Sequence, residues 1–231
     1  TGLFGWTHFG NVVSNLAYVV VGIVGLIVVR PVRIDAAAAV RAAISAWFIG
    51  FILVAAGSAW YHSHPNDSTL VWDRAAMTIV FAAATALFIS DRISARAGPA
   101  FLIGLIALGL ASQIYWHLTG DLRIYRFVEY LPFVIVPAIC LLFPGRLTTF
   151  RHALAIIAVF AAATLCEHFD HDIHRLFGGA VSGHAIKHIV SAAAGWLLVP
   201  MIRGDARRSN SRPPCNSIAE RASGNVRSDP I

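Results

Sequence analysis

The feature that most constrains the fold of this chain is a series of seven apolar stretches, each about twenty residues long. A helix of that length spans the roughly 30 Å hydrocarbon core of a bilayer, and the connectors between the stretches are short and carry proline, glycine or arginine. The sequence therefore predicts an all-α, polytopic membrane protein whose residues 1–203 form a seven-transmembrane helix bundle. The predicted spans are about 12–29, 42–61, 73–90, 98–117, 125–143, 150–167 and 184–202.

The composition supports a membrane protein over a soluble one. Of the 231 residues 57% are hydrophobic and only 13% are charged, whereas soluble domains carry charge on about a quarter of their residues. The net charge of +6 comes from arginines in the connectors and in residues 204–231, a polar segment that we expect to be a disordered tail. This distribution is typical of the positive-inside rule, so we expect the lipid bilayer, and not nucleic acid, as the partner.

The arginines also predict an orientation. They are more numerous on the connectors that follow the first, third, fifth and seventh spans, while the acidic residues gather on the other set. Because basic residues favour the cytoplasmic side, this places the N-terminus outside and the C-terminus in the cytoplasm. Nothing in the sequence indicates the oligomeric state.

Span parity places several polar residues at one membrane face. The end of every even span and the start of every odd span share a side, so His62, Asp73, His184 and His188 lie near one face. The same end holds these further polar residues: Asn15, Gln113, His117, Arg126, Glu129 and Glu167. Polar side chains at membrane depth are costly and mark functional cavities. We therefore expect a polar cavity in the outward-facing half of the bundle.

The histidines at this end suggest a metal site. His184 and His188 are four residues apart, so on a helix their rings project from one face, although this spacing also arises from packing alone. His62 adds a third imidazole at the same depth. Three protein ligands and one open position are typical of catalytic zinc, which lowers the pKa of a water in the open position toward about 7. The sequence thus predicts a Zn²⁺ site.

Two further residues are candidates for catalytic roles. Asp73 can take and deliver a proton near a metal site, or it can act as a helix N-cap or as a partner of Arg74. Ser58 precedes His62 by one helical turn, so its hydroxyl can donate to a developing oxyanion. Alternatively, Ser58 bonds to a carbonyl of its own helix.

Other polar residues have a structural interpretation. We expect Lys187 to reach the interface or to pair with Glu167, and we assign it no catalytic role. The histidine-rich run 167–174 is interpreted as a solvated loop, with a second metal site as the alternative. Arg126 and Glu129 predict a structural ion pair at the cavity wall, with a role in binding a substrate headgroup as the alternative.

These motifs resemble a known family. Ser-x-x-x-His at Ser58 and His62, followed by Asp73 and by His-x-x-x-His at His184 and His188, is similar to the alkaline ceramidases. That family belongs to a larger group of seven-helix membrane hydrolases that includes the progestin and adiponectin receptors. The resemblance implies a zinc-dependent amidase in which the three histidines hold zinc. Ser58 and Asp73 would then activate the attacking water and stabilise the oxyanion.

The local text resembles the bacterial branch of that family and covers roughly residues 6–203. It is carried by the segments Asn11-Val12-Val13-Ser14-Asn15-Leu16-Ala17, Val71-Trp72-Asp73-Arg74-Ala75-Ala76-Met77 and Ser182-Gly183-His184-Ala185-Ile186-Lys187-His188. The resemblance implies location in a bacterial inner membrane and hydrolysis of the amide bond of a ceramide-like membrane lipid. Residues 1–8 lack the acidic residues with which eukaryotic members bind calcium, so we predict no calcium dependence. The alternative from another class is a non-catalytic receptor or transporter whose histidines carry protons or hold a structural ion.

Overall fold

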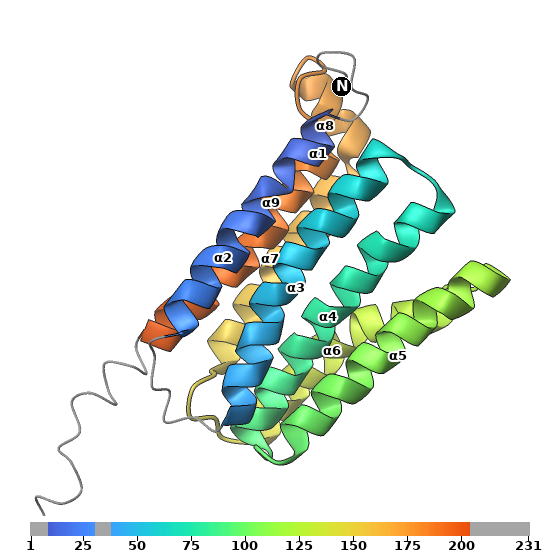
Figure 1. The fold of residues 1–231 in the computed structure, drawn as a ribbon. Helices are drawn as coiled ribbons and strands as arrows, with labels where there is room; N and C mark the ends of the chain where they lie inside the picture. Colours follow the sequence, from blue (N-terminus) through green and yellow to red (C-terminus); the bar gives the residue numbers. More distant parts are fainter. Residues whose placement is uncertain (1–8, 31–37, 204–231) are drawn as a thin grey trace, which may run out of the picture.

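The predicted all-α bundle is confirmed. A computed structural model describes residues 9–30 and 38–203, which are helical with no strand among them (Figure 1). The helices are α1 (Phe9–Ser14), α2 (Leu16–Val29), α3 (Ala38–Ser63), α4 (Asp67–Arg92), α5 (Ala97–Thr119), α6 (Arg123–Leu142), α7 (Phe150–His168), α8 (Asp170–Leu176) and α9 (Gly183–Trp196). The predicted tail 204–231 and the calcium-related residues 1–8 lie outside the described residues.

Within this part of the chain, seven helical stretches are long and apolar enough to cross a membrane, which makes the protein an integral multi-pass membrane protein. These stretches are Phe9–Val29, Ala38–Ser63, Asp67–Arg92, Ala97–Thr119, Arg123–Leu142, Phe150–His168 and Gly183–Arg203. Each overlaps one predicted span and most extend beyond it, because polar end turns continue the helix past the apolar window. The orientation of the termini stays a prediction.

The first span and the histidine-rich run differ in detail from expectation. The first span is divided at Asn15 into α1 and α2, and the Asn15 side-chain amide donates to the Asn11 carbonyl oxygen at 2.8 Å. The run 167–174 is not a loop, because α8 begins at Asp170. Its first turn is acidic and its last turn holds His174, an order that suits the helix dipole, and none of its residues is buried. The polarity therefore marks a solvated helix.

The core lies where α2, α3, α4 and α9 pack together, and α5 stands at the edge of the bundle (Figure 1). Phe48 of α3 is fully buried against Gly25 of α2, where an added Cβ would collide with the phenyl ring. By contrast, α5 exposes large apolar side chains such as Ile103 and Leu118. Such a face suits contact with lipid tails.

A hydrogen-bonded clamp fixes the end of α4 to the connection between α6 and α7. The Asp91 carboxylate accepts from the backbone N–H of Leu147 at 3.0 Å and of Thr148 at 2.8 Å. Arg92 donates to the Phe143 carbonyl oxygen at 2.6 Å and to the Thr148 hydroxyl at 2.8 Å. This clamp lies at the C-terminal end of α4, and the histidines lie at the other end of the bundle.

Helix α6 contains two prolines, Pro132 and Pro137. A proline has no N–H, so the carbonyls of Val128 and Phe133, four residues earlier, receive no intrahelical hydrogen bond from these positions. Membrane helices tolerate such gaps where neighbouring groups or local adjustments compensate. The α6 backbone is therefore less constrained over these two turns than the backbone of a regular helix.

Candidate metal centre

Three histidines from two helices come together, as span parity predicts. His62 lies in the last turn of α3, while His184 and His188 lie near the start of α9. One nitrogen of each imidazole lies within 4.8 Å of the others, and the two Nε2 atoms of His62 and His184 are 2.9 Å apart. His62 and His188 are buried. Among the described residues this is the one group of three or more possible ligands, so the run 167–174 forms no second site.

The start of α9 is fixed by Ser182. Its hydroxyl oxygen accepts from the Ala185 backbone N–H at 3.0 Å, the usual contact of a serine N-cap, and its proton goes to Asn11 Oδ1 at 2.7 Å. The first contact begins the helix, and the second joins it to α1. The two ligands on α9 are thus placed relative to the N-terminal helix as well as to α3.

Gly183 allows α9 to begin close against α7 and α8. A Cβ at this position would lie 2.8 Å from the Asp170 Cα and closer still to the Cys166 carbonyl oxygen. The next residue, His184, donates its backbone N–H to Asp170 Oδ1 at 2.8 Å. The backbone of this ligand is therefore held by a close approach and by a hydrogen bond at the same turn.

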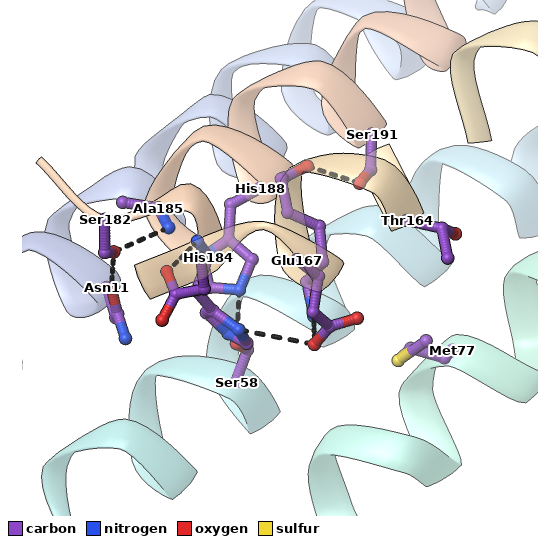
Figure 2. A network of polar contacts seen from close by, with 12 residues as sticks. Asn11, Ser58, Met77, Thr164, Glu167, Ser182, His184, Ala185, His188 and Ser191 are labelled. Atoms are coloured by element: carbon purple, nitrogen blue, oxygen red, sulfur yellow. Dashed lines mark hydrogen bonds and ion pairs between the residues drawn. The ribbon is translucent and has the colours of Figure 1, made fainter. Parts of the chain in front are cut away.

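The side chain of His184 is oriented by Glu167. Its Nδ1 lies 3.4 Å from Glu167 Oε1 (Figure 2). Its Nε2 faces His62. Lys187 donates to the same carboxylate oxygen at 2.7 Å, which confirms the predicted pairing with Glu167. A carboxylate behind a histidine fixes the ring and raises its basicity toward a metal.

The two ring nitrogens of His188 meet two serines. Nδ1 lies 2.8 Å from Ser14 Oγ, and Nε2 lies 3.4 Å from Ser58 Oγ. Ser58 is almost fully buried, and Figure 2 shows its side chain beside His184 and His188. The hydroxyl of Ser58 therefore lies next to the histidine group, as its position one turn before His62 predicts.

Asp73 lies on α4 and lines the same cavity as Ser58 and His188. A Cβ on Gly57 would lie 3.1 Å from the Asp73 Cα, so this glycine allows α4 to approach α3 directly beside Ser58. The carboxylate lies within electrostatic reach of Lys187 and makes no hydrogen bond to the described residues. It remains available to a bound molecule.

Of the two structural alternatives for Asp73, the N-cap is wrong, and Arg74 contributes only a nearby positive charge. The N-cap of α4 is Asn66, whose side chain accepts from the Thr69 N–H at 3.0 Å, because the helix begins one and a half turns before Asp73. Arg74 forms no ion pair with Asp73 in the described structure. Its guanidinium lies over the Trp116 ring at 4.3 Å from the ring centre.

The cavity extends far from the histidines. It has an empty volume of about 1270 Å³, counting its open mouth, and its polar lining gathers at the histidine end. That lining includes the predicted ion pair of Arg126 and Glu129, confirmed at 2.8 Å. Along α4 the lining runs from Asp73 to Phe88, a distance of roughly 22 Å at 1.5 Å per residue. This length exceeds the thickness of one leaflet of hydrocarbon, which is about 15 Å.

The donor set fits a metal ion. Ligands at 2.0–2.1 Å from a tetrahedral ion lie roughly 3.4 Å apart, and the three imidazole nitrogens require only small movements to reach this spacing. Imidazole suits zinc, copper, iron and nickel, so the set favours a transition metal over calcium or magnesium. The site is therefore a candidate metal centre with a serine and a carboxylate beside it.

Several residues of this site are absent from the sequence prediction. The contacts of Ser14 with His188 and of Asp170 with the His184 backbone were not expected, and Glu167 was named only as a possible partner of Lys187. Ser14 offers a signal, since it is a polar residue inside an otherwise apolar span and one residue from Asn15.

Comparisons with protein-family models, curated proteins and solved structures found no match in any of the three. The functional argument therefore depends on the geometry of the site and on its motifs.

Proposed function

We propose that this protein is a membrane-embedded, zinc-dependent hydrolase that cleaves the amide bond of a ceramide-like N-acyl lipid. The observation that carries the proposal is the convergence of His62, His184 and His188 beside Ser58, at the polar end of a long apolar cavity. The resemblance of the same residues to the alkaline ceramidases supports it. The histidine cluster supports a metal, and we infer zinc because three imidazole ligands with an open position are typical of catalytic zinc.

The cavity suits a substrate with a long apolar chain and a polar group at one end. Its apolar lining runs along α3, α4, α6 and α7, while Ser58, Asp73 and His188 stand at the end nearest the histidines. An acyl chain placed along the apolar part brings its carbonyl carbon to these polar groups. The proposal places the mouth of the cavity against the bilayer, so that the acyl chain need not pass through water.

The residues of the chain then have separate roles. When bound, the zinc polarises the amide carbonyl and lowers the pKa of the attacking water. Ser58 donates a hydrogen bond from its hydroxyl to the oxyanion that develops on the carbonyl oxygen. Asp73 takes the proton of the water and delivers it to the amide nitrogen, so that the C–N bond breaks to give a fatty acid and an amine. Glu167 holds His184 in place throughout.

The test combines metal content with hydrolysis. Purified protein in detergent or nanodiscs is incubated with a fluorescent N-acyl sphingoid lipid, and release of the fatty acid is measured with zinc content. We expect His188→Ala to lose both, whereas Ser58→Ala and Asp73→Asn keep the metal and lose activity by about 10²-fold or more. His117→Ala, at the C-terminal end of α5 and outside the histidine group, serves as the matched control.

Two results would refute the proposal. A His188→Ala protein that lacks metal and keeps full activity would exclude a metal-dependent reaction. A wild-type protein that holds zinc but hydrolyses no N-acyl lipid would favour the receptor or transporter alternative.

A further inference from the structure

The Ser14 hydroxyl has two neighbours and a single proton. Its Oγ lies 3.0 Å from the Asn11 carbonyl oxygen and 2.8 Å from His188 Nδ1. A carbonyl oxygen can only accept, so the serine proton points to Asn11. With its proton there, the hydroxyl turns its lone pairs toward His188, so Ser14 can accept a hydrogen bond from Nδ1 of this ring.

We propose that Ser14 is a positioning residue that accepts a hydrogen bond from the Nδ1–H of His188 and thereby presents Nε2 of that ring to the metal. A neutral imidazole carries one N–H and one free lone pair, so a proton on Nδ1 leaves Nε2 free to bind a metal. This inference depends on the metal centre described above. It is independent of amide hydrolysis.

The ring of His188 has little freedom to offer its other nitrogen. The side chain is almost completely buried, and its ring lies against Tyr18 with the ring centres 5.8 Å apart. Nε2 already faces the interior, where Ser58 lies 3.4 Å away. A 180° flip of the ring would put the carbon Cδ2 where Nδ1 now lies and would lose the contact with Ser14, so this contact favours the observed ring orientation.

Ser14 and Glu167 support their histidines differently. Glu167 brings a negative charge to Nδ1 of His184, and Lys187 shares that charge. Ser14 brings no charge, so its effect on His188 is mainly one of orientation. Because Ser14 lies on α1 and His188 on α9, binding of a metal to His188 also strengthens the contact between these helices. By linkage, the docking of α1 and the affinity for metal support each other.

The test uses two variants of nearly the same shape. Ser14→Thr keeps the hydroxyl, and Ser14→Val replaces it with a methyl group. Affinity for Zn²⁺ is measured by competition with a chelator, and Co²⁺ absorption reports the ligand geometry. We expect Ser14→Val to bind Zn²⁺ 10 to 100-fold more weakly than wild type and Ser14→Thr to stay within a few fold. The melting temperatures of the metal-free proteins show whether either variant is misfolded.

A second measurement requires no variant. The ¹⁵N chemical shifts of labelled His188 in the metal-free wild-type protein report which ring nitrogen carries the proton, and we expect Nδ1. In hydrogen exchange, the backbone amides of α1 are expected to gain protection when Zn²⁺ is added.

The outcomes test the metal centre and the role of Ser14 separately. A wild-type protein that binds no metal overturns both the metal centre and the role of Ser14. If wild type binds Zn²⁺ and Ser14→Val binds it equally well, the metal centre stands and the role of Ser14 is rejected. If both variants bind weakly, the ¹⁵N result decides: a proton on Nδ1 supports the role, and a proton on Nε2 overturns it.

Discussion

Gly183→Ala is expected to weaken Zn²⁺ binding at the proposed site without removing any ligand. The new Cβ would lie 2.8 Å from the Asp170 Cα, whereas ordinary contacts begin at 3.4 Å, and the Cys166 carbonyl oxygen is closer still. Both neighbours are backbone atoms, so α9 must retreat by roughly 0.6 Å or more at the residue before His184. Metal–ligand distances tolerate about 0.2 Å. The affinity for Zn²⁺ should therefore fall at least about tenfold.

The higher helix propensity of alanine offsets only part of the cost of this close contact. Alanine favours a helix over glycine by about 1 kcal/mol, while overpacking a close contact costs about 1–3 kcal/mol, so a net loss of stability is expected. Gly104→Ala on α5 is the matched control, since its added Cβ meets nothing within 4 Å and it should leave Zn²⁺ affinity unchanged. Chelator competition measures both variants. Wild-type affinity in Gly183→Ala would show that the close approach does not position His184.

Three further predictions concern other parts of the molecule. Gly57→Ala places a Cβ 2.7 Å from the Trp72 carbonyl oxygen and pushes α4 away from α3, so lipid hydrolysis should fall more than zinc content. Removal of zinc should lower the melting temperature in detergent, because about 2.7 kcal/mol of stabilisation is lost from a protein that was saturated at 100 times its Kd. Outside the spans, hydrogen bonds from the Arg123 side chain lower the pKa of Asp121 to about 2. The stabilisation from this depressed pKa is present above pH 4 or so and is lost as the pH falls toward 2, and a ¹³C titration should show the Asp121 pKa rising toward its ordinary value in Arg123→Gln.

The gross architecture and the histidine cluster were predictable because they follow from local rules. Apolar length determines the spans, and span parity alone brings His62 to the same face as His184 and His188. The spacing of four residues on α9 places two rings on one side of the helix. These inferences need no knowledge of which helices touch.

The supporting contacts were not predictable, because they depend on distances between helices that are remote in sequence. Ser14 and His188 are separated by 174 residues, and no local pattern joins them. Gly183 reads as an ordinary helix start, and only its approach to α7 shows why a side chain is excluded. The run 167–174 was misinterpreted for a different reason: its polarity indicates exposure to solvent, and an exposed segment can be a helix as readily as a loop.

The two prolines of α6 have a mechanical consequence for the cavity. Pro132 and Phe133 line it, so the helix with missing backbone hydrogen bonds also forms a wall of the cavity. Bending a regular helix strains its hydrogen bonds, whereas α6 can bend at these turns with fewer bonds to lengthen. The side of the cavity formed by α3 and α4, where Gly57 brings the two backbones into contact, has no proline inside either helix. The reactive groups Ser58 and Asp73 are therefore carried by helices without such gaps, and α6 is the wall that can bend with less loss of backbone hydrogen bonding.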